Sequence, residues 1–169
     1  MRSSYVKPIA PIACMVLAAC AGDNPENVPL YGQWEMTTRV DSLSIDGMQV
    51  PRDQFPPEFK ALAGTEKRCG EPMFIDRDWQ EKDINRKVQG SCKLKAYDVT
   101  QTLVTGNGQC TEVAPEAEFN PEFTLRIDQA EASYRIVLTM EGSALIRGVD
   151  GRHYIKAIAV QDGVRSGDC

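Results

Sequence analysis

The sequence predicts a mainly β domain with a minor α component: a single antiparallel sheet, barrel- or sandwich-like, accompanied by one or two short helices. Three observations lead to this fold class. Short runs in which apolar and polar residues alternate recur along the chain, as expected of half-buried strands. Turn sequences that contain glycine separate several of these runs. Only residues 76–88 have the length and the ends of a good helix. Repeated short strands with such turns indicate an antiparallel sheet folded onto itself.

The first strand is predicted at residues 33–40. Its apolar residues Trp34, Met36 and Val40 share one parity, so they occupy one face of a strand, and polar residues occupy the other. Asp46-Gly47 follows as a turn, because both residue types tolerate the backbone conformations that tight turns need.

Two helical segments are expected next. Residues 58–62 can form one helical turn behind a proline pair, and we expect that turn to end at Gly64. The better candidate is 76–88, which is marked by Asp76 as the cap, Gly90 as the stop, and a modest apolar stripe of Trp79, Ile84 and Val88. Because this segment is short for an isolated helix, packing against the rest of the domain must hold it.

The rest of the chain is predicted to be strands and turns. We expect strands at residues 92–97, 102–105, 123–127, 134–140 and 154–160. We expect turns at Gly106-Asn107-Gly108, at 129–131, at Asp150-Gly151 and at Asp162-Gly163, and an acidic irregular stretch at 115–121. The alternation in 123–127 and 134–140 is regular, so these two strands should form a hairpin with one buried face.

Residues 1–19 have the features of an export signal: a positively charged start, an apolar segment over residues 8–16, and small residues after it. The apolar segment is shorter than the ~20 residues that span a bilayer. The final tetrapeptide Leu17-Ala18-Ala19-Cys20 resembles the lipobox of bacterial lipoproteins, in which the cysteine receives a lipid and cleavage occurs just before it. The alternatives are an ordinary secretory signal, cut near residue 18 or 19, and an uncleaved anchor.

This resemblance divides the chain into three parts: a lipoprotein signal peptide at 1–19, a lipidated tether at 20–30, and a disulfide-bridged β-rich domain at 31–169. Several acyl chains are enough for stable attachment, so the mature protein is expected on a membrane without a spanning helix. Ala21, rather than Asp, follows the cysteine. In the enteric lipoprotein sorting rule, this favours the outer membrane, with the domain facing the periplasm.

Removal of the first 19 of the 169 residues takes away two basic residues and no acidic ones. The formal net charge therefore changes from -5 to -7, with 24 acidic residues retained. Binding of nucleic acid calls for a basic face, so this composition argues against it. The remaining length is enough for one domain with a sizeable core.

The number of cysteines in the predicted mature domain is consistent with export. Cys14 lies in the predicted signal and Cys20 is the predicted lipidation site, which leaves an even set of four: Cys69, Cys92, Cys110 and Cys169. In an oxidising compartment such a set predicts two disulfides, with three connectivities to choose from. Free buried thiols or a zinc site are the alternatives. No C-x-x-C spacing occurs, and the chain has one histidine.

The mature chain resembles a family of exported proteobacterial proteins whose defining domain has no assigned function. The resemblance is carried by Gly32-Gln33-Trp34-Glu35-Met36-Thr37, by the cysteine near one third of the chain, by a cysteine pair about one hairpin apart, and by the terminal Gly167-Asp168-Cys169. It covers most of 31–169. The acidic insert at 115–121 and Ser166 depart from the family pattern. The resemblance implies a small β-rich envelope domain and supplies no catalytic residues.

The resemblance also implies a disulfide pairing. It treats Cys92 and Cys110 as a unit, which leaves Cys69 and Cys169 to pair with each other. The first pair requires residues 99–102 to turn. The turn chemistry of Asn107-Gly108 favours a different hairpin in which Cys92 has no cysteine opposite, so the composition of this region argues for the alternative.

Few residues suit catalysis. A Ser-His-Asp arrangement would have to use His153, which lies beside a predicted turn, where a solvated or hydrogen-bonded role is expected. The acidic residues Asp76, Asp78, Glu81 and Asp83 have helical spacing and fit a solvated helix face better than a calcium loop. We therefore predict no catalytic, cofactor-binding or metal-binding residues. Trp34, Tyr134 and Tyr154 fit a plain core better than a ligand pocket.

The sequence thus predicts a lipid-anchored cell-envelope protein that is not an enzyme and serves as a binding or structural module. Its expected partners are the membrane, through the anchor, and either another protein or a small apolar ligand. The alternative is a carboxylate-dependent hydrolase that acts on an envelope substrate, since many pairs of acidic residues are available. An open apolar interior would favour a ligand, whereas a filled interior together with an exposed apolar patch would favour a protein partner.

Overall fold

The computed structural model describes residues 26–113 and 117–169, and confirms a mainly β fold with one antiparallel sheet. Cys20 and the predicted signal lie outside the described residues. The elements, in chain order, are β1 (Gly32–Ile45), β2 (Met48–Gln49), η1 (Arg52–Gln54), α1 (Pro57–Ala61), β3 (Gly64–Gly70), α2 (Arg77–Val88), β4 (Ser91–Val99), β5 (Leu103–Thr111), β6 (Ala117–Phe119), β7 (Glu122–Ala130), β8 (Ser133–Ile146) and β9 (Arg152–Gly167).

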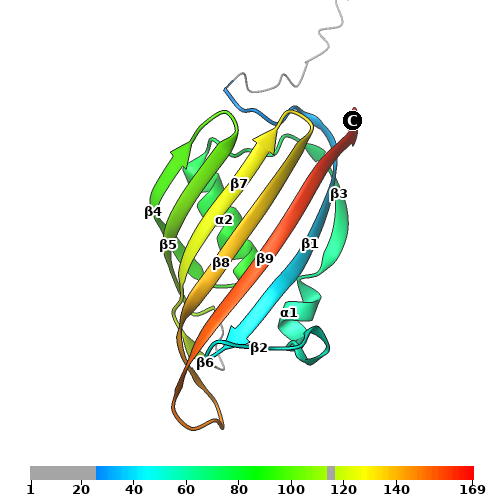
Figure 1. Ribbon diagram of the computed structural model, residues 1–169. Helices are drawn as coiled ribbons and strands as arrows, with labels where there is room; N and C mark the ends of the chain where they lie inside the picture. Colours follow the sequence, from blue (N-terminus) through cyan, green and yellow to red (C-terminus); the bar gives the residue numbers. More distant parts are fainter. Residues whose placement is uncertain (1–25, 114–116) are drawn as a thin grey trace, which may run out of the picture.

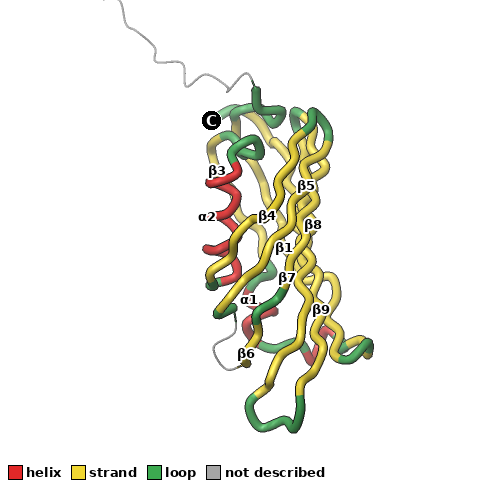
Figure 2. Tube along the Cα trace, turned by 90° about the vertical axis from the view of Figure 1, so that its left-hand side faces the viewer, coloured by secondary structure: helices red, strands yellow, loops and turns green. Residues whose placement is uncertain are grey.

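The described strands form one sheet in the order β2-β1-β9-β8-β7-β5-β4, in which β3 also pairs with β1 and β6 also pairs with β8. All of these pairings are antiparallel. The sheet is curved but not closed: β4 and β3 lie at its two margins, and α2 lies across one face (Figures 1 and 2). In a closed barrel, strands would cover the side between these two margins. In this protein, α2 covers it.

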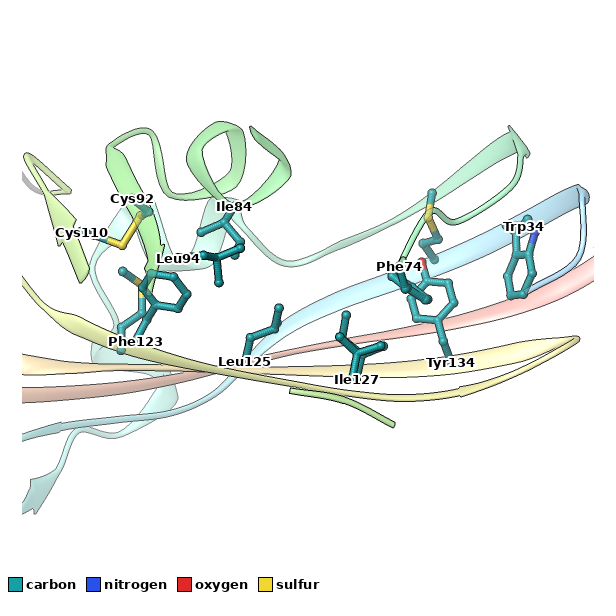
Figure 3. Packing of buried hydrophobic residues seen from close by; sticks show 13 residues of the cluster. Trp34, Phe74, Ile84, Cys92, Leu94, Cys110, Phe123, Leu125, Ile127 and Tyr134 are labelled. Carbon is teal, nitrogen blue, oxygen red and sulfur yellow. A yellow bond between two sulfur atoms is a disulfide. The ribbon is translucent and has the colours of Figure 1, made fainter. Parts of the chain in front are cut away.

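The main core fills the space between the sheet and α2. Alternate residues of the central strands point into it, as the register of β7 and β8 requires, and Ile84 contributes from the helix (Figure 3). The buried members are Trp34, Met36, Phe74, Ile84, Cys92, Leu94, Val104, Cys110, Phe123, Leu125, Ile127, Tyr134 and Met140. A smaller cluster under η1 and α1 contains Val40, Leu43, Phe55 and Ala157. The interior is thus packed with side chains.

Side chains spaced four residues apart on α2 form hydrogen bonds with backbone groups at the open edge of β4. Asn85 accepts from the Cys92 N–H and donates to the Cys92 carbonyl, over 3.2 Å for the latter bond. Glu81 accepts from the Leu94 N–H at 2.9 Å, and Arg77 donates to the Leu94 carbonyl. Side chains at this spacing share one helix face, so they can follow a strand edge. This edge is therefore covered in the way that protects a sheet from unwanted pairing.

Replacing Asn85 with alanine should lower the free energy of unfolding by about 1–3 kcal/mol, because two backbone groups of Cys92 would lose their partner in a partly buried place. Denaturation with urea, followed by circular dichroism, measures the loss. Lys82→Ala, on an exposed position of the same helix, serves as the control and should change stability by less than ~0.5 kcal/mol. Equal effects of the two substitutions would contradict the proposed role of Asn85.

The predicted turn at Gly106-Asn107-Gly108 is wrong, because these residues lie inside β5. A Cβ atom on Gly108 would lie 2.0 Å from the Lys93 carbonyl oxygen and 2.6 Å from the Phe123 ring. Glycine is needed here for close approach between strands rather than for a turn. The chain turns instead at residues 100–102, where the Thr100 hydroxyl accepts from the Leu103 N–H at 3.0 Å.

The predicted turn at Asp162-Gly163 is also wrong, for the same reason. Both residues lie inside β9, which continues to Gly167. A Cβ atom on Gly163 would lie 2.2 Å from the Tyr134 ring, so the glycine makes room for that ring on the neighbouring strand. Beyond these two positions, β8 and β9 are longer than their alternating runs, and β3 and β6 are strands that the sequence did not predict.

The two disulfides have the pairing that the family resemblance implied. Cys92 and Cys110 face each other across β4 and β5, with their Cα atoms 3.9 Å apart, and both are fully buried. The other bridge joins Cys69, near the end of β3, to Cys169, the last residue, over 5.8 Å between Cα atoms. β1 lies between β3 and β9, since Gln33 is paired with both Cys69 and Gly167. This second bridge therefore spans the start of β1.

Candidate functional site

A cavity lies where α2 approaches β1 and β3. Its volume of about 40 Å³ is enough for a few water molecules or the end of one side chain, and much less than the ~300 Å³ or more of small-molecule pockets. The cavity is lined by apolar side chains on the sheet side and by charged ones at its mouth. Together with the exposed margin of β3, it forms what we name the β3 groove.

The floor of the β3 groove is aromatic. The Tyr134 ring lies 4.9 Å from the Phe74 ring, edge to face, and 5.4 Å from the Trp34 ring (Figure 3). Trp34 Nε1 donates to the Leu30 carbonyl at 3.1 Å, which fixes the indole. The Tyr134 side chain belongs to the buried core and also lines the cavity. Burial raises the pKa of this phenol, so its hydroxyl stays protonated further into the alkaline range than that of an exposed tyrosine.

Charged side chains of α2 form one side of the mouth. The buried carboxylate of Asp83 pairs with Arg86 and with Lys87, the latter over 2.7 Å. Lys87 also donates to the Gln161 side-chain oxygen at 3.1 Å, which connects the helix to β9. The prediction that this group of acidic residues forms a solvated face is therefore wrong for Asp83. It is also wrong for Glu81, which is bound to Lys93 and to the β4 backbone, and whose pKa these two contacts lower.

The other side of the mouth is β3, which presents an open strand edge. Residues 64–69 are all exposed, and Glu66 and Arg68 line the cavity with their side chains. Within the described chain, the β3 backbone has hydrogen-bonded strand partners only on β1. Alternate N–H and C=O groups of an antiparallel edge strand point away from its partner, so those of β3 are available for another strand.

The opposite face of the sheet carries ion pairs and a shallow polar pocket of about 130 Å³ near Glu122 and Glu141, which are paired across β7 and β8. A hydrolase with two carboxyl groups needs one of them to hold its proton at neutral pH. The carboxyl groups whose pKa values are shifted in the described chain, those of Asp46, Glu81 and Asp128, all have lowered pKa values, each beside a positive or hydrogen-bonding partner. The hydrolase hypothesis gains no support from them.

His153 has a structural hydrogen-bonding role. Its Nδ1 lies 2.7 Å from Asp46 Oδ2 and its Nε2 lies 3.1 Å from the Asp150 carbonyl oxygen. Asp46 also accepts from the Tyr154 N–H at 2.8 Å. These contacts join the turn after β1 to the β8–β9 hairpin. The hydrogen bond to Asp46 raises the pKa of His153, and the hydrogen bond to His153 lowers that of Asp46.

We expect an NMR titration of the His153 ring to give a pKa above the ordinary ~6.5. A raised pKa in the folded state means that the stabilisation is fully present below the unfolded pKa and is lost as pH rises through the folded pKa. The contact is also lost at low pH. Because the pKa of Asp46 is lowered, its carboxyl is protonated, and the contact removed, only when the pH falls through that lowered pKa. Asp46→Asn should return the pKa of His153 toward its ordinary value. An unchanged titration in this variant would show that Asp46 is not the cause.

The structure brings some of the predicted residues together and separates others. Trp34 and Tyr134 lie side by side in the core, as expected, and also form the floor of the β3 groove. Tyr154, which the sequence grouped with them, lies elsewhere on β9 and is 47% exposed. The β3 edge was missed entirely. Its sequence, GTEKRCG, has no apolar alternation because neither of its faces is buried.

No family model, curated protein or solved structure matches this chain. The resemblance to the exported proteobacterial family therefore stays a prediction. Among the described residues, no helix is long and apolar enough to cross a membrane. The described part of the chain also contains no group of three or more His, Cys, Asp or Glu side chains arranged to hold a metal ion.

Proposed function

We propose that this chain is a lipid-anchored protein of the bacterial cell envelope, attached through Cys20 to the outer membrane and facing the periplasm, and that its domain is a non-enzymatic binding module for another protein. The lipobox-like tetrapeptide before position 21 supports the anchor. Two disulfides agree with an oxidising compartment. The filled interior argues against a carried lipid or cofactor, because the cavity is too small for either.

The observation that carries the binding proposal is the open edge of β3 beside a side-chain-sized cavity. Recognition by strand addition uses main-chain hydrogen bonds for affinity and pockets for alternate side chains for specificity. The β3 groove has both parts: the free edge of Gly64–Gly70, and the cavity with the Tyr134 ring at its floor. An extended segment of a partner that paired with β3 would therefore place every second side chain toward the aromatic floor.

The position of the edge suits an anchored protein. The described chain begins beside the end of the molecule that holds the C-terminus and the end of β3 (Figure 1). Five residues lie between Cys20 and Glu26, so the two Cα atoms are six steps and at most ~21 Å apart along a fully extended chain. The β8–β9 hairpin lies at the opposite end of the molecule. In this arrangement the β3 groove lies close to the membrane surface, where it would meet an extended segment of another envelope protein.

Selection of peptides from a display library on the mature lipoprotein in detergent micelles tests the proposal. Peptides that bind in the β3 groove should bind at least tenfold more weakly to Arg68→Glu, because this exposed side chain lines the cavity. Arg147→Glu, the same charge change at the exposed β8–β9 turn, should leave the Kd within twofold. A library without binders, or binders that are indifferent to Arg68, would contradict the proposed site.

A further inference from the structure

We propose that the occupant of the β3 edge is the β3 strand of a second copy of this chain, paired antiparallel about a two-fold axis at Lys67. This inference rests on the proposed function, which makes the β3 edge a binding surface, and it names the partner. A two-fold interface requires one surface to be complementary to itself. The segment Glu66-Lys67-Arg68 meets that requirement when it runs antiparallel to its own copy.

The register follows from the sequence of the strand. With Lys67 on the axis, Glu66 lies opposite Arg68 of the second copy, and Arg68 lies opposite Glu66 of that copy. Opposite charges directly across an antiparallel pair are stabilising, and each pair occurs twice. Both side chains belong to the face that lines the β3 groove, so the two ion pairs would lie on the same side of the joined sheet.

The central contact, between Lys67 and its own copy, brings two like charges together. Lys67 would lie opposite its own copy, which would cost energy if both ammonium groups were free. Each Lys67 Nζ already lies 3.1 Å from Glu35 Oε2 of the adjacent strand in its own chain. The like charges are therefore neutralised within each copy, and Glu35 and Lys67 are paired across β1 and β3.

The charges of β3 also restrict which strands it accepts. Lysine and other charged residues at a sheet edge normally protect it against indiscriminate pairing. A strand without opposite charges at the matching positions would leave Glu66 and Arg68 facing apolar groups, so it would be rejected. Within the described chain, the β3 backbone has strand partners only on β1, so its other edge is open to a second strand. The strand also lies at a margin of the molecule in Figure 1.

A strand pairing of this length is a small contact, so we expect weak association in dilute solution and stronger association on a membrane. The two-fold axis is perpendicular to the sheet and reverses the second copy, so both copies can be attached to one bilayer only when this axis lies along the membrane normal. Attachment in that orientation confines the two copies near each other, which raises their effective concentration. The test is therefore made with the mature lipoprotein in vesicles of phosphatidylethanolamine and phosphatidylglycerol, and repeated in detergent micelles by sedimentation equilibrium.

Charge exchange gives the most specific readout. Glu66→Arg alone and Arg68→Glu alone should each weaken dimer formation at least fivefold, because like charges would then face each other. The double variant Glu66→Arg/Arg68→Glu restores both cross-strand pairs and should recover the dimer to within twofold of the original protein. Recovery in the double variant could not come from a general loss of folding, and circular dichroism of each variant confirms that the sheet is intact.

A cross-link tests the position of the axis. In vesicles, Lys67→Cys should give a disulfide-linked dimer under mild oxidation. Lys95→Cys, at an exposed position of β4, should give little of this dimer. A monomer in vesicles, or a double variant that fails to recover the dimer, would overturn self-pairing. If selected peptides nevertheless lose affinity for Arg68→Glu, the β3 edge remains a binding site for another protein. If self-pairing fails and the affinity of the selected peptides is also unchanged in Arg68→Glu, both the self-pairing and the proposed binding site are wrong.

Discussion

Replacing Cys69 and Cys169 together with serine is expected to lower the free energy of unfolding by up to ~4.7 kcal/mol, because their bridge closes a loop with a sequence separation of 100 residues. That loss is a large part of the 5–15 kcal/mol that typically stabilises a domain. The bridge also spans the start of β1 and holds the end of β3 in place. Urea denaturation of the variant, followed by circular dichroism, measures the effect.

The second bridge provides the comparison. Cys92 and Cys110 are 18 residues apart, so their replacement by alanine should cost about 3 kcal/mol from loop closure. These two cysteines are fully buried, whereas Cys69 and Cys169 are exposed. A mild reductant followed by thiol labelling should therefore mark the exposed pair first. Labelling of the buried pair first, or a larger loss of stability on its removal, would contradict this account.

Trp34→Ala should be the most destabilising single substitution in the β3 groove, with a loss of about 3–5 kcal/mol. Trp34 is 1% exposed, packs against the Tyr134 ring, and donates to the Leu30 carbonyl. Its removal leaves a void in the core and an unpaired carbonyl on residue 30. Chemical denaturation followed by far-ultraviolet circular dichroism suits this variant, since one of the two tryptophans is lost.

The matched control for Trp34 is Val164→Ala on β9, where the valine is 56% exposed. This change should alter the free energy of unfolding by less than ~0.5 kcal/mol. If Trp34→Ala were equally mild, the indole could not be a central part of the core. The family resemblance would then lose the structural reason for its Gly-x-Trp-Glu start.

The strands that could be predicted from the sequence are those with one buried face. The runs at 123–127 and 134–140 lie in β7 and β8, where each apolar side chain on the inner face contacts the core. Helix α2 was predicted because Asp76 caps it, accepting from the Trp79 N–H at 2.9 Å. These features depend on local periodicity and local hydrogen bonds, so they are visible in a single sequence.

The rest depends on contacts between distant residues. Glycine in β5 resembles a turn signal, but it is required by the approach of Lys93 and Phe123. Asp83 resembles a surface residue, but helix packing buries its carboxylate between two cations. The β3 edge has both faces exposed and therefore no alternation, so the central part of the candidate site had no signal of its own. The aromatic floor could be predicted as core, but its place beside an open edge could not.

The start of the ordered domain also differs from the prediction. Asn27 and Pro29, assigned to the tether, are buried. The Asn27 side chain donates to the Pro72 carbonyl at 2.9 Å and accepts from the Phe74 N–H at 3.2 Å. A residue held by hydrogen bonds to the loop before α2 leaves no periodic pattern in the sequence. These contacts attach the predicted tether directly to the wall of the β3 groove.

Intact mass spectrometry of the mature protein, extracted from the envelope without reductant, tests most directly whether an acylated and oxidised domain is what the cell holds at its membrane. We predict a chain that starts at Cys20, carries the mass of a diacylglyceryl group and an added acyl chain, and gains two hydrogen atoms for each of its two disulfides on reduction. An unmodified chain that retains residues 1–19, with all of its thiols already reduced, would contradict the account.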